Sequence, residues 1–543
     1  MAVSGGFRIS VGGLRLSARS PLLVALLAVI NFTIWIAQAR RSNAVTSDLE
    51  LVWESLTRHS KWILMIGLIS GAIAVTFSTR SAAGADASGY LSEAALLTSG
   101  RLFHDDGLFE VARGHDPYLT TPLGWRPARV EAKQSPTYAP GLPMLMAIPH
   151  ALAGVSGATF VVIVSAIVAI IATGLIASQL GGSIAGIIAA ALIGFTPVFI
   201  HQSIQPMSDV PVTAAWMVTF ALSYGQRSFW SGLACALAVL IRPNLAPLAI
   251  VPLFIAPKKM TFAIPVAIAG VFLAVVQSLW YGSPLQSGYG ATEELFAVSN
   301  IIPNIGRYSR WWLATAPAML LGVFGVIRLR ADRVARALAV FAALVIGAYL
   351  IYAVFDDWSY LRFLLPALAV AAIFAAVELA AWIERWTINV RVPLLFAVVI
   401  GLTAYSIFIA RSLDTFKLAD QVERVATVAD YLNANVEPSA VLLSGEQSGS
   451  MRYYTGRSIL RWEAATPESL NAVFPVLAQT SHPVFIVLDA WEEAPFRAKL
   501  SSTVPLDWPP MLEAGTTHRT RVWRLSDRAR YLKGAAVDTV RLR

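Results

Sequence analysis

Apolar runs of about 17 to 25 residues recur along the chain as far as residue 410, with short polar segments between them. Because a bilayer core contains no water, each backbone N–H and C=O of a crossing segment must be bonded within that segment, so helices are expected. We therefore predict a polytopic α-helical membrane protein with about 11–12 transmembrane helices. The expected spans are 61–78, 158–178, 184–200, 209–224, 229–241, 244–256, 260–281, 311–327, 337–355, 361–383 and 392–410.

Basic residues in the short loops indicate which side each loop occupies. Arg227, the pair 258–259, the cluster 328–336 and the segment 385–391 read as cytoplasmic under the positive-inside rule. Parity then places 79–157, 201–208, 282–310, 356–360 and everything after 411 on the outer side. Arg307 and Arg310 do not follow the rule, and the four basic loops outweigh them.

Three stretches are ambiguous. The segment 21–37 is either an additional span or an interfacial helix, within an N-terminal extension of residues 1–60. The segment 141–153 is too short to cross, and we expect an interfacial helix on the outer face, inside a large outer loop at 79–157. The runs 229–241 and 244–256 are expected to be two short helices that meet at a buried Arg242.

The last part of the chain has a different character. From about residue 414 it becomes charged, with expected strands at 440–444 and 484–488 and expected helices at 414–433 and 467–479. These elements predict a soluble α/β domain at 411–543 on the outer side, following a membrane domain at 61–410. The polar segment 444–450 is expected to be an ordinary loop. No phosphate loop, GxSxG motif or metal-spaced Cys/His set occurs in this part.

Composition agrees with a membrane protein and excludes some functions. Hydrophobic residues make up 56% of the 543 residues and charged residues 14%, whereas soluble domains have about 25% charged residues. The net charge of +9 does not indicate nucleic-acid binding, because the basic residues lie in short loops between spans. The single cysteine, Cys235, excludes an intramolecular disulfide.

Asp86 is the first candidate for chemistry, since it follows the first span by fewer than ten residues. It is either a general base that takes the proton of an acceptor hydroxyl or the N-cap of a helix at 87–99 that ends at Gly100. Tyr90 and Glu93 lie on the same helical face as Asp86, at i+4 and i+7. Glu93 is either a second catalytic carboxylate or a solvated or paired residue.

The rest of the outer loop contains further polar residues. His104, Asp106, His115 and Asp116 have the chemistry of metal ligands, but their spacing matches no metal motif, so a solvated loop is favoured and no metal site is predicted. Lys133 is a candidate phosphate contact. Tyr138 begins the segment 138–143 that leads into the interfacial helix and is a candidate substrate contact, as is Tyr90.

Three cations and a second carboxylate accompany the spans. Asp209 starts a span on the outer face and is either functional or a helix cap stabilised by the dipole. A charge at membrane depth costs about 2.5–3.5 kcal/mol, so Arg242 and Arg362 require a partner or a function. The planar guanidinium group of arginine can bond two phosphate oxygens at once, so both are candidate phosphate contacts. The alternative for Arg362 is that its side chain extends to the membrane interface beside its aromatic neighbours. Arg307 is a candidate substrate contact, or part of an aromatic interfacial belt. A surface position is expected for His201.

The order of short motifs resembles the GT-C glycosyltransferase superfamily, especially its bacterial protein O-mannosyltransferase-like and lipid A aminoarabinose transferase-like branch. The resemblance covers about residues 61–410 and rests on the Asp86 loop followed by YAPGLP at 138–143, MSDVP at 207–211, LIRPN at 240–244 and RFLLP at 362–366. Each motif is short, and their order with the right parity is much more specific.

The resemblance implies transfer of a sugar, with inversion, from a polyprenyl-phosphate carrier to a lipid, glycan or protein acceptor on the outer face of a bacterial inner membrane. It implies that Asp86 is the catalytic acidic residue and Asp209 an acidic residue near the acceptor. It implies basic residues around the lipid phosphate, here Lys133, Arg242 and Arg362. No cofactor is required, although the chemistry leaves room for a divalent metal.

Two departures from the family leave the sugar and the acceptor open. Ala87 follows Asp86 where the mannosyltransferase branch commonly has Asp-Glu, and the C-terminal domain is unlike the β-trefoil insert of eukaryotic protein mannosyltransferases. Three alternative functions also remain. They are a transporter or flippase, an oligosaccharide ligase with a pyrophosphate-linked donor, and a non-catalytic membrane scaffold.

Overall fold

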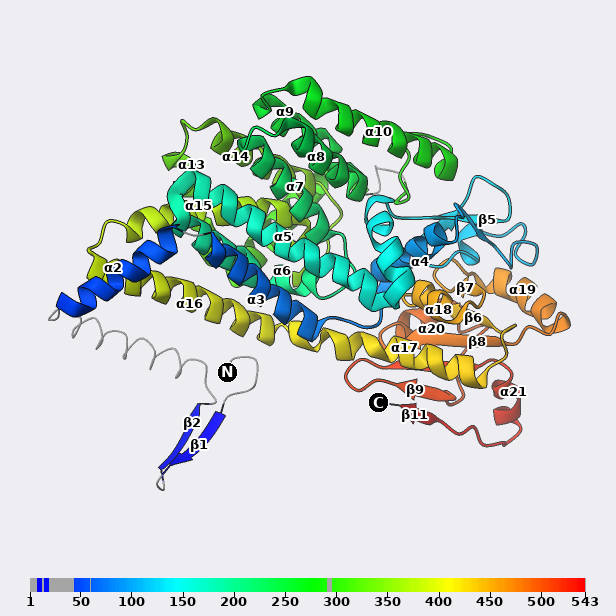
Figure 1. Ribbon diagram of the computed structural model, residues 1–543. Coiled ribbons are helices and arrows are strands. Elements are labelled where there is room, and N and C mark those ends of the chain that lie inside the picture. The colour runs from blue at the N-terminus through cyan, green and yellow to red at the C-terminus, as the bar shows by residue number, and fades with distance from the viewer. Residues whose placement is uncertain (1–6, 12–13, 19–42, 59, 291–294, 543) are drawn as a thin grey trace.

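The structure is a computed structural model that describes residues 7–11, 14–18, 43–58, 60–290 and 295–542 (Figure 1). At the start of the chain, strands β1 (Phe7–Val11) and β2 (Leu14–Ala18) pair antiparallel. The segment 21–37, for which the sequence leaves a span or an interfacial helix open, lies outside the described residues.

The helical part follows the expected order of spans. Its elements are α2 (Asn43–Arg58), α3 (Lys61–Phe77), α5 (Gly141–Phe195), α6 (Pro197–Ser203), α7 (Asp209–Tyr224), α8 (Ser228–Ile241), η2 (Pro243–Ala249), α9 (Ile250–Ile255), α10 (Lys259–Tyr281), η3 (Val298–Asn300), α12 (Ile301–Thr315), η4 (Pro317–Leu321), α13 (Gly322–Arg328), α14 (Arg333–Leu350), η5 (Trp358–Leu364), α15 (Leu365–Ile383) and α16 (Ile388–Ser412). Within the described residues, five helices are long and apolar enough to cross a membrane, or seven if each of two bent helix pairs counts as one span. Several shorter helices, such as the 16-residue α7 and the 14-residue α8, account for other expected spans.

Helix α5 is three helical pieces joined by two tight turns. The backbone leaves the helical region at residues 153–154 and 181–182, where Gly154 (φ 57°) and Gly182 (φ 82°) adopt the left-handed conformation. The second and third pieces then run back along each other, since Gly174 packs closely against Gly186 across the second turn. The short helix expected at 141–153 and the separate spans expected at 158–178 and 184–200 correspond to these pieces.

The span expected at 311–327 contains a sharp bend that the sequence did not predict. Helix α12 ends at Thr315, and the following Pro317–Arg328 segment is bent by 108° from it. Pro317 lacks the backbone N–H that would continue the helix, so the chain turns there. Helix α12 is instead amphipathic, exposing Ile302 and Leu313 on one side.

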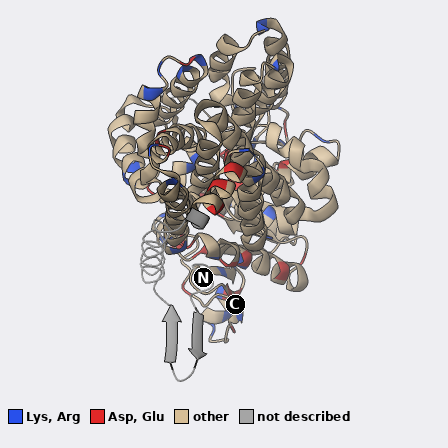
Figure 2. Cartoon of the chain, turned by 60° about the vertical axis from the view of Figure 1, so that its left-hand side comes forward, with Lys and Arg blue, Asp and Glu red and all other residues tan. Residues whose placement is uncertain are grey.

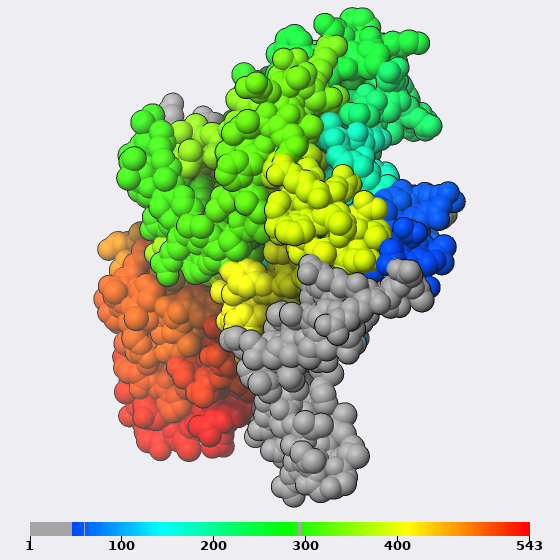
Figure 3. All heavy atoms as spheres, turned by 90° about the vertical axis from the view of Figure 1, so that its left-hand side faces the viewer, coloured from blue at the N-terminus to red at the C-terminus, as the bar shows by residue number. Residues whose placement is uncertain are grey.

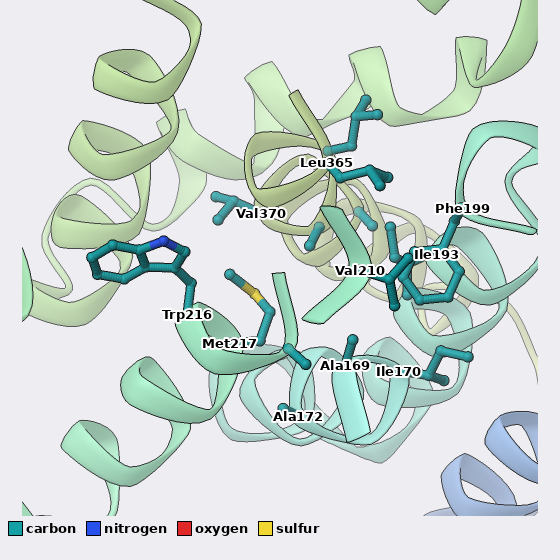
Figure 4. Packing of buried hydrophobic residues seen from close by; sticks show 14 of the residues in the cluster. Ala169, Ile170, Ala172, Ile193, Phe199, Val210, Trp216, Met217, Leu365 and Val370 are labelled. Atoms are coloured by element: carbon teal, nitrogen blue, oxygen red, sulfur yellow. The ribbon is translucent and has the colours of Figure 1, made fainter. Parts of the chain in front are cut away.

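The helices divide into an enclosed centre and a lipid-facing periphery. Helices α5, α7 and α15 form the centre, where side chains such as Ile170, Trp216 and Val370 interdigitate (Figure 4). By contrast, most of the residues of α10 and α16 are at least partly exposed, including large apolar side chains such as Ile268 and Ile400. Charged residues are sparse along the bundle (Figure 2). This distribution is typical of a bundle that lies in lipid, where outward apolar side chains carry no penalty.

The segment after α3 forms a small polar layer at one end of the bundle. It consists of α4 (Gly84–Thr98), η1 (Pro117–Leu119) and a three-stranded antiparallel sheet ordered β3 (His104–Asp105), β5 (Lys133–Pro136), β4 (Trp125–Pro127). Helix α4 matches the expected helix and ends just before Gly100 in the left-handed conformation.

The C-terminal residues form an α/β lobe beside this layer (Figure 1), and Figure 3 shows this lobe in orange and red at one end of the molecule. Its sheet has the order β11 (Val540–Leu542), β9 (Leu512–Ala514), β10 (Thr520–Arg524), β8 (Val484–Asp489), β6 (Val441–Ser444), β7 (Ile459–Arg461), with β6 parallel to β7 and β8 and β10 antiparallel to β8. Five helices accompany it, α17 (Leu418–Asn435), α18 (Ser448–Thr455), α19 (Pro467–Gln479), α20 (Glu493–Leu500) and α21 (Asp527–Leu532), with the short η6 (Thr415–Lys417) before them. The predicted combination of a multi-helix membrane domain with a C-terminal α/β region is confirmed.

Candidate active site

Asp86 lies in the first turn of α4, with its carboxylate turned toward the helical bundle. One oxygen accepts a hydrogen bond from the Tyr138 hydroxyl at 2.8 Å, and the other accepts one from Arg362 Nη2 at 2.8 Å. Ala83, not Asp86, precedes the helix as its N-cap, so the helix-cap interpretation of Asp86 is wrong. The side chain is 34% exposed, and two of the roughly four acceptor positions of a carboxylate remain available for a substrate hydroxyl.

A second carboxylate–arginine pair lies deeper. Asp209 Oδ1 accepts a hydrogen bond from Arg242 Nη2 at 2.7 Å, with side-chain exposures of 1% and 12%. Ser208 is the N-cap of α7, and Asp209 makes no capping bond, so the cap interpretation of Asp209 is also wrong. The Ser208 hydroxyl accepts hydrogen bonds from Arg242 at 3.0 Å and from the Tyr90 hydroxyl at 2.9 Å. This serine therefore joins α4 to the buried ion pair.

One aromatic ring lies near both arginines. The Phe363 ring lies 5.9 Å from the guanidinium carbon of Arg242 and 5.2 Å from that of Arg362. Tyr349 stacks on the same ring at a centroid distance of 5.1 Å. Each guanidinium thus has both an anionic partner and an aromatic neighbour, which offsets the cost of burying two like charges in a poorly solvated region.

A cavity of about 520 Å³ opens next to this arrangement. One wall is the lipid-facing helix α10, through Gly270, Leu273 and Gln277, and the opposite wall carries Arg242 and Tyr349. Most of the lining is apolar, and Arg242 is the one charged side chain among the described lining residues. The other polar or aromatic lining residues include Tyr90, Tyr138, Ser208, Asn244, Tyr281, Tyr289 and Tyr352.

The close approach of α4 to Tyr138 depends on Gly89. A Cβ atom at residue 89 would lie 2.2 Å from Cε2 of the Tyr138 ring and 3.1 Å from the Cα atom of Gly124. The Tyr138 ring in turn packs on Tyr90 at a centroid distance of 4.6 Å. The absence of a side chain at Gly89 therefore lets the Tyr138 ring pack against α4 and place its hydroxyl on the Asp86 carboxylate.

Of the predicted site residues, Tyr90, Tyr138 and Arg242 line the cavity. Asp86 and Asp209 are hydrogen-bonded to Tyr138 and Arg242 without lining it themselves, and Arg362 pairs with Asp86.

The other three predicted site residues do not line the cavity either. Lys133 is on β5 and pairs with Asp105 at the surface, and Arg307 pairs with Asp356 at 2.9 Å on α12. Glu93 is fully buried, and neither carboxylate oxygen has a hydrogen-bond partner among the described residues. The expectation of a solvated or paired Glu93 is therefore wrong. Burial raises the pKa of Glu93 well above its ordinary value, which favours the neutral acid.

The polar loop residues mostly stabilise turns. Asp106 accepts hydrogen bonds from Leu108 N and Thr120, and Asp116 accepts one from Tyr118 N at 2.9 Å. No group of three or more His, Cys, Asp and Glu residues within the described parts of the chain is placed to bind a metal ion. His201, expected at the surface, is instead half-buried with its ring against Trp358.

The site also contains residues that the sequence did not single out. Asn244 donates a hydrogen bond to the Tyr349 hydroxyl at 3.1 Å, and Ser208, Phe363 and Tyr352 complete the surroundings of Arg242. Asn244 could have been found as a polar residue directly after Arg242-Pro243 in an apolar run. The aromatic residues carry no such signal, because aromatic side chains are common in any span.

No known family model matches this chain, and no curated protein sequence matches it either. Solved structures do match its fold. ArnT from Cupriavidus metallidurans bound to undecaprenyl phosphate aligns with a TM-score of 0.55 and 12% identity, covering 86% of this chain and 98% of that one. The archaeal oligosaccharyltransferase AglB from Archaeoglobus fulgidus, in complex with an inhibitory peptide and a dolichol-phosphate, aligns with a TM-score of 0.51 and 13% identity, covering 82% and 72%. Its apo form gives a TM-score of 0.53 at 14% identity over the same shares of the two chains.

The fold is therefore that of the GT-C membrane glycosyltransferases, as the sequence motifs predicted. The chain is similar in fold to ArnT, a lipid A aminoarabinose transferase, over nearly the whole length of that protein. At these identities the similarity establishes the architecture alone.

Proposed function

We propose that this protein transfers a sugar from a polyprenyl-phosphate carrier to an acceptor hydroxyl, with inversion at the anomeric carbon. The observation that carries the proposal is a partly exposed carboxylate, Asp86, next to an apolar cavity whose one charged lining residue, among those described, is Arg242. Two solved structures of the same fold hold lipid phosphates, namely undecaprenyl phosphate in ArnT and dolichol-phosphate in AglB. We place the site on the outer face of a bacterial inner membrane, from the distribution of basic loops.

The cavity suits the donor. A polyprenyl chain is apolar and reaches a site most easily from the bilayer, and α10 forms a wall that also faces lipid. The phosphate would meet Arg242, whose fork can bond an oxygen while the guanidinium still pairs with Asp209. Asn244 and Tyr349 offer further donors next to it. We assign to Asp209 the role of holding Arg242, and we leave Lys133 out of the donor site because it lies on the outer sheet.

Asp86 would act as the general base. As the acceptor oxygen attacks the anomeric carbon from the side opposite the phosphate, its proton passes to a free position on the Asp86 carboxylate. The bond from the anomeric carbon to the phosphate oxygen breaks, and the phosphate leaves with the electron pair. Tyr138 and Arg362 fix the direction of the carboxylate, so the base and the leaving group are presented in line.

The charge of the cavity favours a monophosphate donor over the pyrophosphate donor of an oligosaccharide ligase. A second phosphate would bring additional negative charge into a cavity where Arg242 is the one described charged lining residue. The polyprenyl phosphate is already a good leaving group, so electrostatic stabilisation by Arg242 accounts for its departure without a strong acid, and we assign Arg362 to Asp86 instead of to the phosphate. We therefore propose a reaction that requires no cofactor.

The test compares wild-type membranes with an Asp86→Asn variant and with Asp356→Asn as the matched control, since Asp356 is 88% exposed and does not line the cavity. Transfer from a labelled pool of polyprenyl-phosphate sugars is measured after confirming equal folded protein. We expect a loss of about 100-fold or more for Asp86→Asn and no loss for the control. Equal transfer by both variants would refute the base role, and no transfer by wild type would refute the donor class.

A further inference from the structure

A buried chain of polar groups connects the C-terminal lobe to the start of α4. Gln447 is 3% exposed, and its Oε1 atom accepts a hydrogen bond from the backbone N–H of Gly84 at 3.0 Å. Its Nε2 atom donates to Asp489 Oδ2 at 2.9 Å, and the same oxygen accepts a hydrogen bond from Arg424 at 3.0 Å. Gly84 is the first residue of α4 and lies two residues before Asp86.

The direction of the Gln447 amide is fixed by its partners. Asp489 is fully buried and paired with Arg424, so it offers acceptors and the Gln447 NH₂ group must face it. The amide oxygen then faces Gly84. The N–H groups of the first helical turn have no partner within a helix, and α4 has no side-chain cap of its own. A glutamine from the C-terminal lobe therefore supplies the missing acceptor, 363 residues away in sequence.

Two further side chains of the same segment contact the loop around Asp86. The Tyr454 hydroxyl accepts a hydrogen bond from the backbone N–H of Ala82 at 2.6 Å, and the Ser448 hydroxyl accepts one from that of Leu123 at 3.0 Å. Helix α18 packs directly along α4 as well. These contacts hold the backbone just before Asp86 and the neighbouring loop at Leu123, and their side chains do not line the cavity.

We propose that Gln447 is a positioning residue that sets the direction of Asp86 from the C-terminal lobe, which makes this lobe a part of the catalytic apparatus. The inference rests on the proposed function for its catalytic consequence. The segment 444–450, expected from sequence to be an ordinary loop, is then the element through which the lobe acts. Donor binding should not depend on it, because Arg242 and Tyr349 belong to the helical bundle.

The experiment uses the full-length protein in detergent and two readouts. The Gln447→Leu variant removes both hydrogen bonds of the amide, and Gln479→Leu is the matched control, since Gln479 is exposed at the end of α19. Hydrogen–deuterium exchange is measured on peptides covering 82–88, with 484–489 reporting that the lobe remains folded. Transfer kinetics are measured with the labelled polyprenyl-phosphate sugar.

We expect exchange at 82–88 to accelerate by about tenfold or more in Gln447→Leu, with 484–489 unchanged. We expect kcat to fall by about 10- to 100-fold while KM for the donor stays the same, because the base is misdirected and the donor site is intact. The Gln447→Asn variant keeps the amide but is one methylene too short to reach both partners, so it should change both readouts in the same direction even if the leucine variant is not recovered folded.

Unchanged exchange at 82–88 in a folded variant would overturn the contact, and accelerated exchange with unchanged kcat would overturn its catalytic role. A 10- to 100-fold rise in KM for the donor, without a fall in kcat, would also overturn the catalytic role of Gln447. A wild type that transfers no sugar would refute the proposed function instead, and the exchange measurement would still confirm or overturn the contact by itself.

Discussion

Replacing Gly89 with alanine tests the packing that brings Tyr138 to Asp86. An added Cβ would lie 2.2 Å from the Tyr138 ring, so the ring must retreat by about 1.2 Å to reach 3.4 Å, the near limit of ordinary contact. Tyr138 is 3% exposed, and the backbone of Gly124 blocks the other side of the new methyl group at 3.1 Å. Neither neighbour can move freely, so the change overpacks a closed site.

Overpacking of this kind costs about 1–3 kcal/mol. In an ordinary helix the same substitution stabilises by about 0.5–1 kcal/mol, so the expected sign is reversed here. Gly306→Ala is the matched control, because Gly306 is exposed in α12 and an added Cβ there meets nothing within 4 Å. The control should be neutral or stabilising.

The assay is a double-mutant cycle on thermal unfolding in detergent, with Gly89→Ala measured in wild type and in Tyr138→Ala. Removing the ring makes room for the methyl group, so the cost of Gly89→Ala should largely disappear in the second background. Transfer activity should fall in the Gly89→Ala protein, since the displaced hydroxyl no longer holds the Asp86 carboxylate. Equal costs in both backgrounds would refute the packing argument.

Two further predictions concern buried charge. Glu93 has a pKa well above its ordinary value. The folded state therefore keeps a proton on this carboxyl that the unfolded state releases above about pH 4.3. Because of this difference, the protein loses stability as pH rises from about 4.3 toward the pKa of Glu93 in the folded state. The stability of Glu93→Gln relative to wild type should therefore increase between pH 5 and pH 8 in thermal unfolding, and a constant difference would contradict this. Arg242→Met leaves Asp209 buried without its cation and should destabilise by about 3–5 kcal/mol, with partial recovery in the Arg242→Met/Asp209→Asn double variant. Arg307→Met, which loses a surface pair worth about 0–1 kcal/mol, is its control, and equal effects of the two single substitutions would contradict the reasoning.

Elements with local signals were predicted most accurately. Helix α19 has the predicted bounds, Pro467–Gln479, because Thr466 caps it and Pro467 stands at its first position. Helix α4 ends before a left-handed Gly100, as the sequence indicated. The bend between α12 and α13 was missed, because an apolar run with the right length carries no sign of the angle at which its halves meet.

The candidate site shows the same division. The sequence singled out Asp86 by its place just after the first span, and Arg242 and Arg362 as charges in need of a partner or a function, since a charge in an apolar stretch is visible locally. It could not determine which charges meet, because Asp86 and Arg362 are 276 residues apart and only helix packing brings them within 2.8 Å. Lys133 has the same charge as these arginines but lies on the outer sheet, so charge alone does not distinguish a site residue from a surface residue.

The sequence by itself determined that this chain is a multi-span membrane protein with a C-terminal α/β region, because hydrophobic length and periodicity act along the chain. The motif order also indicated the GT-C architecture. The tertiary structure decided the ion pairs, the cavity beside Asp86 and the contact from Gln447 to Gly84. The physical reason is that desolvation and hydrogen bonding are satisfied between segments remote in sequence, and the partner of a buried charge is set by the packing of those segments.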